Sequence, residues 1–291
     1  MPILKYQEFI PHSTLQDSVK RFWILEKEYT AEDGIEEITP DACVELILNF
    51  GRTYSVIAGS AKRRLPNVCL VGLLSKSLRL KAEGLVKIVA VRFFAWGVLA
   101  FLRNTARRTD VTQVTLDLTW QQVVQRVGDL VQGDDYQKAV EEIEDFLIGL
   151  RLNFLFDPKQ VRTAATLLYH TRGQYRVAEL ADYCHLSLRQ LQRQFDQTTG
   201  VSPKALARAI RFESIRERLM FNPNVNLTDL AYEFGYTDQA HFIKDFKALT
   251  GKTPGEFALE MEQLKNVFRD NENVVFLQSP RSMPDYNAGE F

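Results

Sequence analysis

A short pattern of residues occurs twice in the C-terminal part of the chain, and it limits the possible folds more than any other feature. In each copy a phenylalanine is followed by a glycine after five residues and by a proline after three more. Glycine is common just past the end of a helix, and proline is favoured at the first position of the next. The two copies are Phe195, Gly200 and Pro203, and Phe246, Gly251 and Pro254. The chain therefore repeats one helical unit, which has to be explained before other segments are interpreted.

The second copy, residues 226–257, predicts two helices joined by a tight turn and followed by the start of a third. Asn226 and Asp229 can form a capping box at the start of the first helix. Gly235 can adopt the left-handed conformation that reverses the chain, and the small Ala231 lets the two helices cross closely. One apolar face of the first helix is formed by Leu227, Leu230, Ala231 and Phe234. This order of elements describes a helix-turn-helix motif.

The first copy, residues 177–206, follows the same order, with a turn at His185 where the second copy has a glycine. Ser187 and Gln190 offer a second capping box. An ordinary helical hairpin would explain one copy alone. Two copies joined by one long helix, residues 202–221, favour a pair of helix-turn-helix motifs instead.

The segments GYTDQAHF, FK and GKTP follow one another in the second copy. They resemble the second motif of the AraC/XylS family of transcription regulators, which usually reads Gly-Phe-Ser-Asp-Gln-Ser-Tyr-Phe, then Phe-Lys, then Gly and Thr-Pro. The resemblance covers roughly residues 160–265 and includes the first motif. The chain departs from the family at Phe257-Ala258, where Tyr-Arg is common, and has His185 in the first turn. Neither departure threatens the fold, although the first removes one charged contact from the last helix.

The resemblance implies that the second helix of each motif enters the DNA major groove, with its N-terminal, outward residues on base edges. Position by position, it assigns base contacts to Arg189, Gln192 and Arg193 in the first motif and to Gln239, Ile243 and Lys244 in the second. Arginine can bind guanine through two hydrogen bonds, glutamine can bind adenine, and isoleucine can touch a thymine methyl group. Phosphate contacts are expected at Ser187, at Thr237 (with Asp238 as the alternative helix cap) and at Arg208. The two motifs would enter successive major grooves about 10 bp apart.

The formal net charge of the chain is −1, so attraction to DNA has to come from local charge. Residues 172–220 contain nine basic and five acidic residues, whereas the second motif is nearer neutral. We therefore expect the first motif to supply more of the attraction to phosphates, and nonspecific affinity for DNA to be moderate.

The N-terminal part predicts strands, because runs rich in β-branched and aromatic residues are bounded by glycine, proline and asparagine. The expected strands are residues 19–29, 42–50, 54–57, 68–74, 78–81 and 86–93. Within CVELILNF, alternate residues share a face: Val44, Leu46, Leu48 and Phe50 on one side, and Cys43, Glu45, Ile47 and Asn49 on the other. Helices are expected at 95–104, 120–131 and 136–150, and the last two form a hairpin well placed to pack a second copy of the chain.

The expected fold class is α+β, with four parts. A β-rich, barrel-like domain covers residues 1–105, a helical linker 106–156, an all-α domain of seven helices with two helix-turn-helix motifs 157–265, and a tail 266–291. Val274–Leu277 is expected to form a strand that docks on the N-terminal sheet, and the rest of the tail to be disordered. The resemblance gives the N-terminal domain a role in effector binding or dimerisation, and the PDACVELILNFG segment is similar, more weakly, to a common N-terminal module of such regulators.

Five polar or aromatic residues are candidates to line an effector pocket, because a pocket uses a few convergent polar groups. They are Trp23, Glu45, Asn49, Arg92 and Trp96. For both tryptophans a simple core position is the alternative. The charge of this domain is also uneven, acidic over residues 28–50 and basic over 62–108. Neutralisation between neighbouring strands would explain that pattern; a basic surface that faces DNA, the other domain or an anionic ligand is the alternative.

Enzyme activity is not expected, because the chain has no P-loop, no Gly-x-Ser-x-Gly, no HExxH and no dinucleotide fingerprint. In the wider circle of the family, this DNA-binding unit is sometimes fused to alkyl-transfer repair chemistry, which needs an activated cysteine. Of Cys43, Cys69 and Cys184, only Cys184 has a histidine beside it. A DNA-binding architectural protein without sequence preference is the other alternative.

No cofactor or metal is expected, since the histidines are scattered and the cysteines show no paired spacing. The N-terminus does not look like a signal peptide. Residues 88–102 contain Arg92 and fall short of the ~20 apolar residues that span a bilayer. The expected location is therefore a reducing cytoplasm, without a membrane partner. The expected partner is double-stranded DNA, with a small-molecule effector, RNA polymerase and a second copy of the chain as further candidates.

Overall fold

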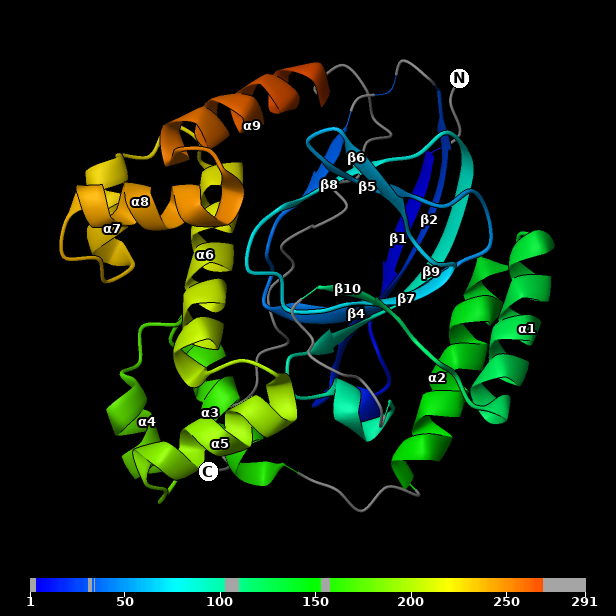
Figure 1. Ribbon diagram of the computed structural model, residues 1–291, viewed down its shortest axis with the longest axis horizontal. Coiled ribbons are helices and arrows are strands. Elements are labelled where there is room, and N and C mark those ends of the chain that lie inside the picture. The colour runs from blue at the N-terminus through cyan, green and yellow to red at the C-terminus, as the bar shows by residue number, and fades with distance from the viewer. Residues whose placement is uncertain (1–3, 31–32, 34, 103–109, 153–157, 269–291) are drawn as a thin grey trace.

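The computed structural model describes residues 4–30, 33, 35–102, 110–152 and 158–268. Across these residues, two β-sheets lie between a pair of helices on one side and a larger group of helices on the other (Figure 1). The expected fold class, a β-rich N-terminal region followed by helices with two helix-turn-helix motifs, is confirmed. The expected strand at 274–277, the rest of the tail beyond 268 and the expected boundary near 105 lie outside the described residues.

Six antiparallel strands form the larger sheet, in the order β1-β2-β9-β4-β7-β10. Its central pair is β2 (Val19–Tyr29) and β9 (Gly84–Phe94), both rich in β-branched and aromatic residues. The remaining strands are β1 (Leu4–Phe9), β4 (Cys43–Asn49), β7 (Val68–Val71) and β10 (Val111–Gln113). The alternation expected on β4 is present, because Leu46 and Ile47 belong to two different apolar clusters, one on each face.

The smaller sheet has the order β3-β8-β5-β6. Its strands are β3 (Glu36–Ile38), β8 (Leu78–Lys81), β5 (Ser55–Ala58) and β6 (Ala61–Arg64). Apolar side chains of both sheets pack between them, among them Leu25 and Ile88 from the larger sheet and Leu80 from the smaller. The other face of the larger sheet is covered by helices.

Two of these helices form the expected hairpin, α1 (Leu118–Gln132) and α2 (Tyr136–Leu152). Their apolar residues, such as Trp120 and Ile143, share one cluster with Val91 of β9. The hairpin therefore closes the face of the larger sheet that the smaller sheet leaves uncovered (Figure 1).

The prediction of a helix at 95–104 is wrong for the described residues 95–102, in which the only helical element is a 3₁₀ turn, η2 (Val98–Ala100). A Cβ atom at Gly97 would lie 2.1 Å from the carbonyl oxygen of Ser18, so the chain passes very close to the residue before β2. The segment is apolar in almost every position, and such a run does not distinguish a helix from a buried irregular chain.

Seven helices follow in the described part of the C-terminal region, as expected. They are α3 (Lys159–His170), α4 (Val177–Tyr183), α5 (Leu188–Thr199), α6 (Pro203–Phe221), α7 (Leu227–Glu233), α8 (Gln239–Thr250) and α9 (Pro254–Phe268). Helix α6 joins two groups: α3, α4 and α5 pack at its N-terminal half, and α7, α8 and α9 at its C-terminal half (Figure 1). None of the described helices combines the length with the apolar composition that a membrane-spanning segment needs.

The β-rich region contacts the C-terminal helices at several places, and two of these contacts lie at the helices that carry the second motif. Lys20 of β2 forms an ion pair with Glu213 of α6, with 3.0 Å between Nζ and Oε1. The backbone amide of Ser77 donates to the carbonyl of Leu249 at the end of α8, at 2.8 Å. The sheets are therefore held against the helix between the two motifs and against the C-terminal end of α8.

Candidate nucleic-acid interface

The two helix-turn-helix motifs have the same dimensions. Helices α4 and α7 each have 7 residues, and α5 and α8 each have 12. Each turn contains one residue in the left-handed conformation, His185 at φ 53° and Gly235 at φ 74°. In both motifs the amide just after this residue donates at 2.9 Å to the small alanine of the first helix, Leu186 to Ala181 and Tyr236 to Ala231.

The second helices of the two motifs also end alike. Gly200 and Gly251 are left-handed, at φ 76° and 79°, and close α5 and α8. In each helix the final threonine is buried and donates its hydroxyl to the carbonyl four residues earlier: Thr199 to Phe195 at 2.8 Å, and Thr250 to Phe246 at 3.1 Å. The spacing of phenylalanine, glycine and proline that the sequence repeats therefore corresponds to the same hydrogen bonds in both motifs.

The helix caps at the expected DNA side differ between the motifs. Ser187 caps α5 in a full capping box with Gln190. Asp238, rather than Thr237, caps α8, and its carboxylate accepts from the amide of His241 at 2.7 Å. The hydrogen bond from that amide lowers the pKa of Asp238. The N-terminus of α8 therefore carries a negative charge that the N-terminus of α5 lacks.

The expected base-reading residues of α5 lie together on its outer face. Arg189, Gln192 and Arg193 are exposed. The described residues provide no hydrogen-bond or ion-pair partner for their side chains. Leu191 and Phe195, on the opposite face, are fully buried. This helix therefore presents three free polar side chains within its first two turns.

Helix α8 presents a similar but less basic face. Gln239 and Lys244 are exposed, and no residue of the described part of the chain pairs with either side chain. Ile243 is half-buried, because it packs against the apolar cluster of α6 to α9. Only part of its side chain is open to a ligand on the outer face.

Arg208 of α6 has a partner inside the protein. Its Nε atom donates to Oδ1 of Asp245 at 2.6 Å, and its Nη2 atom to the Asp245 carbonyl at 3.3 Å. The hydroxyl of Tyr236 donates to Oδ2 of the same carboxylate at 2.8 Å. Arg208 thus fixes α8 and its turn to α6, and its contact with phosphate stays a prediction.

Sequence reasoning did not find Asp245 and Tyr236 as positioning residues. A signal was present, since an aspartate within a predicted helix, three residues after the inward Phe242, needs a partner once it is half-buried. The partner lies 37 residues away, on another helix, which a local pattern does not reveal.

Further contacts hold the first group of helices to α6. Nη2 of Arg211 donates to the carbonyl of Gly173 at 2.8 Å. Gly173 itself is left-handed, and a Cβ atom there would lie 2.1 Å from the carbonyl oxygen of Ala207 on α6. With 19 residues, α6 is about 28 Å long at ~1.5 Å per residue. This length is of the same order as one ~34 Å turn of DNA.

The five candidate effector residues do not form one group. Nε1 of Trp23 donates to Oε1 of Glu45 at 3.3 Å, and Nε of Arg92 donates to the same oxygen at 2.5 Å. Asn49 instead closes the turn after β4, because its Nδ2 atom donates to the carbonyl of Arg52. Trp96 lies in the core on the helix-covered side, stacked on a phenylalanine at 4.8 Å. The structure brings together Trp23, Glu45 and Arg92, whose polar groups pair with one another.

The cysteines lack the surroundings of a reactive thiol. Cys43 and Cys69 are buried, and burial raises the pKa of both, that of Cys69 to about 12. Burial also raises the pKa of the half-buried Cys184. Among the described residues, no group of three or more histidine, cysteine or carboxylate side chains could hold a metal ion.

Two family models match parts of the chain. Residues 180–260 match the model of a helix-turn-helix domain, and residues 7–115 match a domain of unknown function (DUF6597). The transcriptional activator RhaS of Yersinia pestis (strain Pestoides F) is 34% identical over 83 residues, which are 28% of this chain and 30% of that protein. RhaS of Yersinia pseudotuberculosis serotype O:1b matches to the same extent. The match thus spans less than a third of the length of these relatives.

Among solved structures, ToxT of Vibrio cholerae O395 is similar over 82% of this chain and 98% of its own, with 11% identity and a TM-score of 0.46. A probable AraC family regulator of Rhodopseudomonas palustris is similar over 35% of this chain and 96% of its own, with 21% identity and a TM-score of 0.32.

Proposed function

The chain belongs to the AraC/XylS family of transcription regulators, and from that premise we propose that it is a regulator that binds specific DNA sequences through α5 and α8. The observation that carries the proposal is the pair of motifs of equal build at the two ends of α6, each with free polar side chains on its outer face. This arrangement fits two successive major grooves on one side of a duplex. A monomer would then bind an asymmetric site.

The two helices would contribute differently to recognition. Arg189 and Arg193 of α5 can each bind guanine through two hydrogen bonds, and Gln192 and Gln239 can bind adenine. Each such pair discriminates by about 1–3 kcal/mol. Ser187 and the free amides at the start of α5 can hold a phosphate. The carboxylate of Asp238 would repel a phosphate at the start of α8, so we expect the first motif to dominate the salt-dependent part of binding.

The N-terminal region would modulate this activity, either by binding a small molecule or by pairing with a second copy of the chain. Its contacts with α6 and with the end of α8 support the proposal, because a change in the sheets would reach the helices that position both motifs. Contact with RNA polymerase belongs to the same proposal.

The alternatives have less support. Alkyl transfer needs an accessible thiolate, and buried thiols with raised pKa values do not supply one. An architectural protein without sequence preference would gain affinity mainly from phosphates, whereas this chain has a net charge of −1 and neutral or acidic groups at the start of α8.

The test is selection of bound fragments from a sheared source genome, followed by binding curves for the selected site and a scrambled duplex at two salt concentrations. We expect two half-sites about 10 bp apart and a preference of ~10³ or more over the scrambled duplex. Arg193→Ala should relax the preference at the first half-site, and Arg126→Ala, at an exposed arginine of α1, should leave binding unchanged. Fragments without a shared motif, with affinity that collapses in salt, would favour the architectural alternative.

A further inference from the structure

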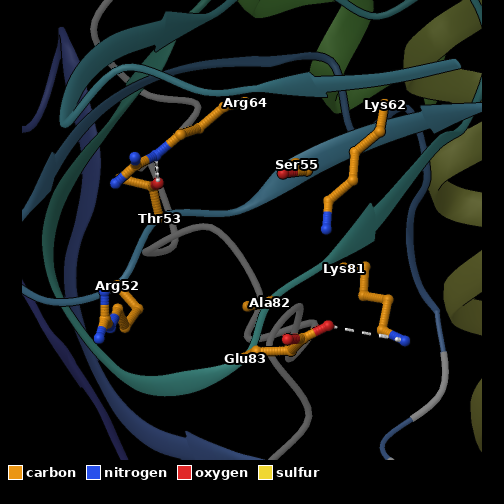
Figure 2. Close-up of a pocket in the computed structure, with 8 residues that line it drawn as sticks. All are labelled: Arg52, Thr53, Ser55, Lys62, Arg64, Lys81, Ala82 and Glu83. Carbon is orange, nitrogen blue, oxygen red and sulfur yellow. Dashed lines mark hydrogen bonds and ion pairs between the residues drawn. The ribbon is translucent and has the colours of Figure 1, made fainter. Parts of the chain in front are cut away.

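Four basic residues surround an open pocket of about 260 Å³ on the smaller sheet. Figure 2 shows Arg64 and Lys62 along its upper side and Arg52 and Lys81 along its lower side. These residues come from β6, β8 and the loop after β4. None of them takes part in the proposed contacts with DNA.

Strand register places three of these cations on one face of the sheet. Ser55 of β5 lies directly opposite Arg64 of β6 on one side and opposite Lys81 of β8 on the other. Lys62 lies two residues before Arg64, and residues two apart on a strand point to the same side. Directly opposite residues also share a face. The basic side chains of β6 and β8 therefore lie on the same face of the sheet, on either side of β5.

This face is the outer one. Val56 follows Ser55 and therefore points to the opposite side, where it lies directly across from Leu80. Both residues pack into the apolar interior between the two sheets. The pocket is consequently separated by the sheet from Trp23, Glu45 and Arg92, which lie on the larger sheet.

Neighbouring acidic residues do not neutralise the pocket. The acidic segment before β4 is used elsewhere, because Glu36 pairs with Lys27 at 2.6 Å and Glu37 with Lys252 at 2.9 Å. The lining of the pocket contains a single carboxylate, that of Glu83. Its Oε1 atom lies 4.0 Å from Nζ of Lys81.

Four cations thus face one carboxylate across the pocket. Arg52 and Lys62 have no ion-pair partner in the part of the chain that the structure describes. Neutralisation between adjacent strands, one explanation of the basic sequence, therefore does not account for the pocket.

The pocket also offers hydroxyl groups. Ser55 is only 6% exposed, and the described residues give its hydroxyl no hydrogen-bond partner. The hydroxyl of Thr53 accepts from Nε of Arg64 at 2.6 Å and so fixes the orientation of that guanidinium. An oriented guanidinium, the free ammonium group of Lys62 and a free hydroxyl are donors of the kind that bind phosphate and carboxylate oxygens.

Size and spacing define the ligand class. Pockets for drug-sized ligands are mostly apolar and hold ~300–1,000 Å³, so this smaller, basic pocket suits a small ion. The Cα atoms of Lys62 and Arg64 are about 7 Å apart, and β6 and β8 are separated by two strand spacings, about 10 Å. We propose that this pocket binds a small anion that carries two or more phosphate or carboxylate groups. The proposal does not depend on the DNA-binding function.

The test is calorimetric titration of the full chain with inorganic pyrophosphate and, in a separate arm, with tricarballylate, at constant ionic strength. We expect saturable binding of at least one of them, and the arm that binds more tightly identifies phosphate or carboxylate as the preferred group. Lys62→Gln/Arg64→Gln, at two exposed positions, should weaken binding at least tenfold. The matched control Arg126→Gln/Lys138→Gln also removes one arginine and one lysine charge, from exposed positions of α1 and α2. It should bind the anion as the parent chain does.

A gain of affinity provides the second measurement. Glu83→Gln removes the single carboxylate of the pocket lining and should strengthen anion binding several-fold, a result that a folding defect cannot produce. Absence of saturable heat with both anions up to millimolar concentration overturns the proposal. Equal loss in the pocket variant and the control variant also overturns it, because the anion would then bind elsewhere. A non-cognate DNA duplex that binds through Lys62 and Arg64 while both small anions fail would assign the surface to DNA instead.

Discussion

At the scale of single residues, the two turns of the motifs differ in one respect. His185 and Gly235 both have left-handed backbone conformations. Glycine has no Cβ atom and adopts this conformation freely, whereas the Cβ atom of other residues clashes with the backbone at a cost of roughly 1–2 kcal/mol. A Cβ atom at Gly235 would meet only the side chain of Gln174, at 3.4 Å. The backbone conformation, not the space around it, therefore favours glycine at this turn.

We predict that His185→Gly raises the free energy of unfolding by about 0.5–1 kcal/mol and that Gly235→Ala lowers it by about 1 kcal/mol. Urea unfolding of each variant, followed by far-ultraviolet circular dichroism, measures both changes. If His185→Gly lowered stability, the imidazole would have to make a contact that outweighs the backbone strain.

The thiols give a second prediction at this scale. Because burial keeps Cys43 and Cys69 protonated, the native chain should show at most one thiol that reacts with a chromogenic disulfide at neutral pH, Cys184. All three should react after denaturation. Rapid reaction of two or three thiols in the native chain would reopen the alkyl-transfer alternative.

At the scale of elements, α6 positions both motifs through the side chains of its arginines. Arg208 and Asp245 fix α8, and Arg211 fixes the loop before α4. Hydrogen bonds to charged groups contribute about 1.5–3 kcal/mol, so loss of the Asp245 contact should loosen α8 without unfolding the chain.

We predict that Asp245→Ala weakens binding to the half-site read by α8 about tenfold, by ~1.4 kcal/mol, and leaves the half-site read by α5 nearly unchanged. Binding curves on duplexes with one half-site scrambled at a time measure this difference. Arg208→Ala should behave in the same way if its role is to position α8. If Arg208→Ala instead weakened binding equally on every duplex, and Asp245→Ala had no effect, Arg208 would be a phosphate contact.

The elements also show what a sequence can predict. The limits of β2 and β8 were expected as they are, because turn residues bound both segments. Strands β1, β3, β6 and β10 were not expected, and β6 shows why: all four of its residues are exposed, so no apolar alternation marks it. Its existence depends on pairing with β5, which the sequence does not show locally.

In the candidate site, too, local patterns could be predicted from the sequence and contacts between distant segments could not. The exposed residues of α5 and α8 could be placed from the repeat, since helical periodicity fixes which residues face outward. The pairing of Arg208 with Asp245 and the separation of Trp96 from Glu45 depend on contacts between distant segments. Such contacts are properties of the tertiary fold.

At the scale of the whole molecule, the sheets and the C-terminal helices meet at an ion pair that is mostly out of solvent. The side chains of Lys20 and Glu213 are 17% and 11% exposed. Removal of one member leaves the other charge buried without a partner, which is far more costly than removal of both.

We predict that Glu213→Gln lowers the free energy of unfolding by about 3 kcal/mol, whereas Lys20→Met/Glu213→Leu loses clearly less. Thermal and urea unfolding of the single and double variants test this. Additive effects of the two substitutions would mean that the pair contributes little to the contact between the two regions.

Helix α6 belongs to two apolar clusters at once. Leu206 and Ile210, in its N-terminal half, belong to the cluster that runs from the larger sheet through α1, α2 and α3 to α5. Ile215 and Leu219, in its C-terminal half, belong to a separate cluster with α7, α8 and α9. We therefore predict that the cooperative units of this chain do not coincide with its sheet-rich and helical regions. The first motif should exchange its amide hydrogens together with the sheets, and the second should open on its own. If the N-terminal region binds an effector that stiffens it, the first motif of the proposed DNA-binding surface should be protected from exchange before the second.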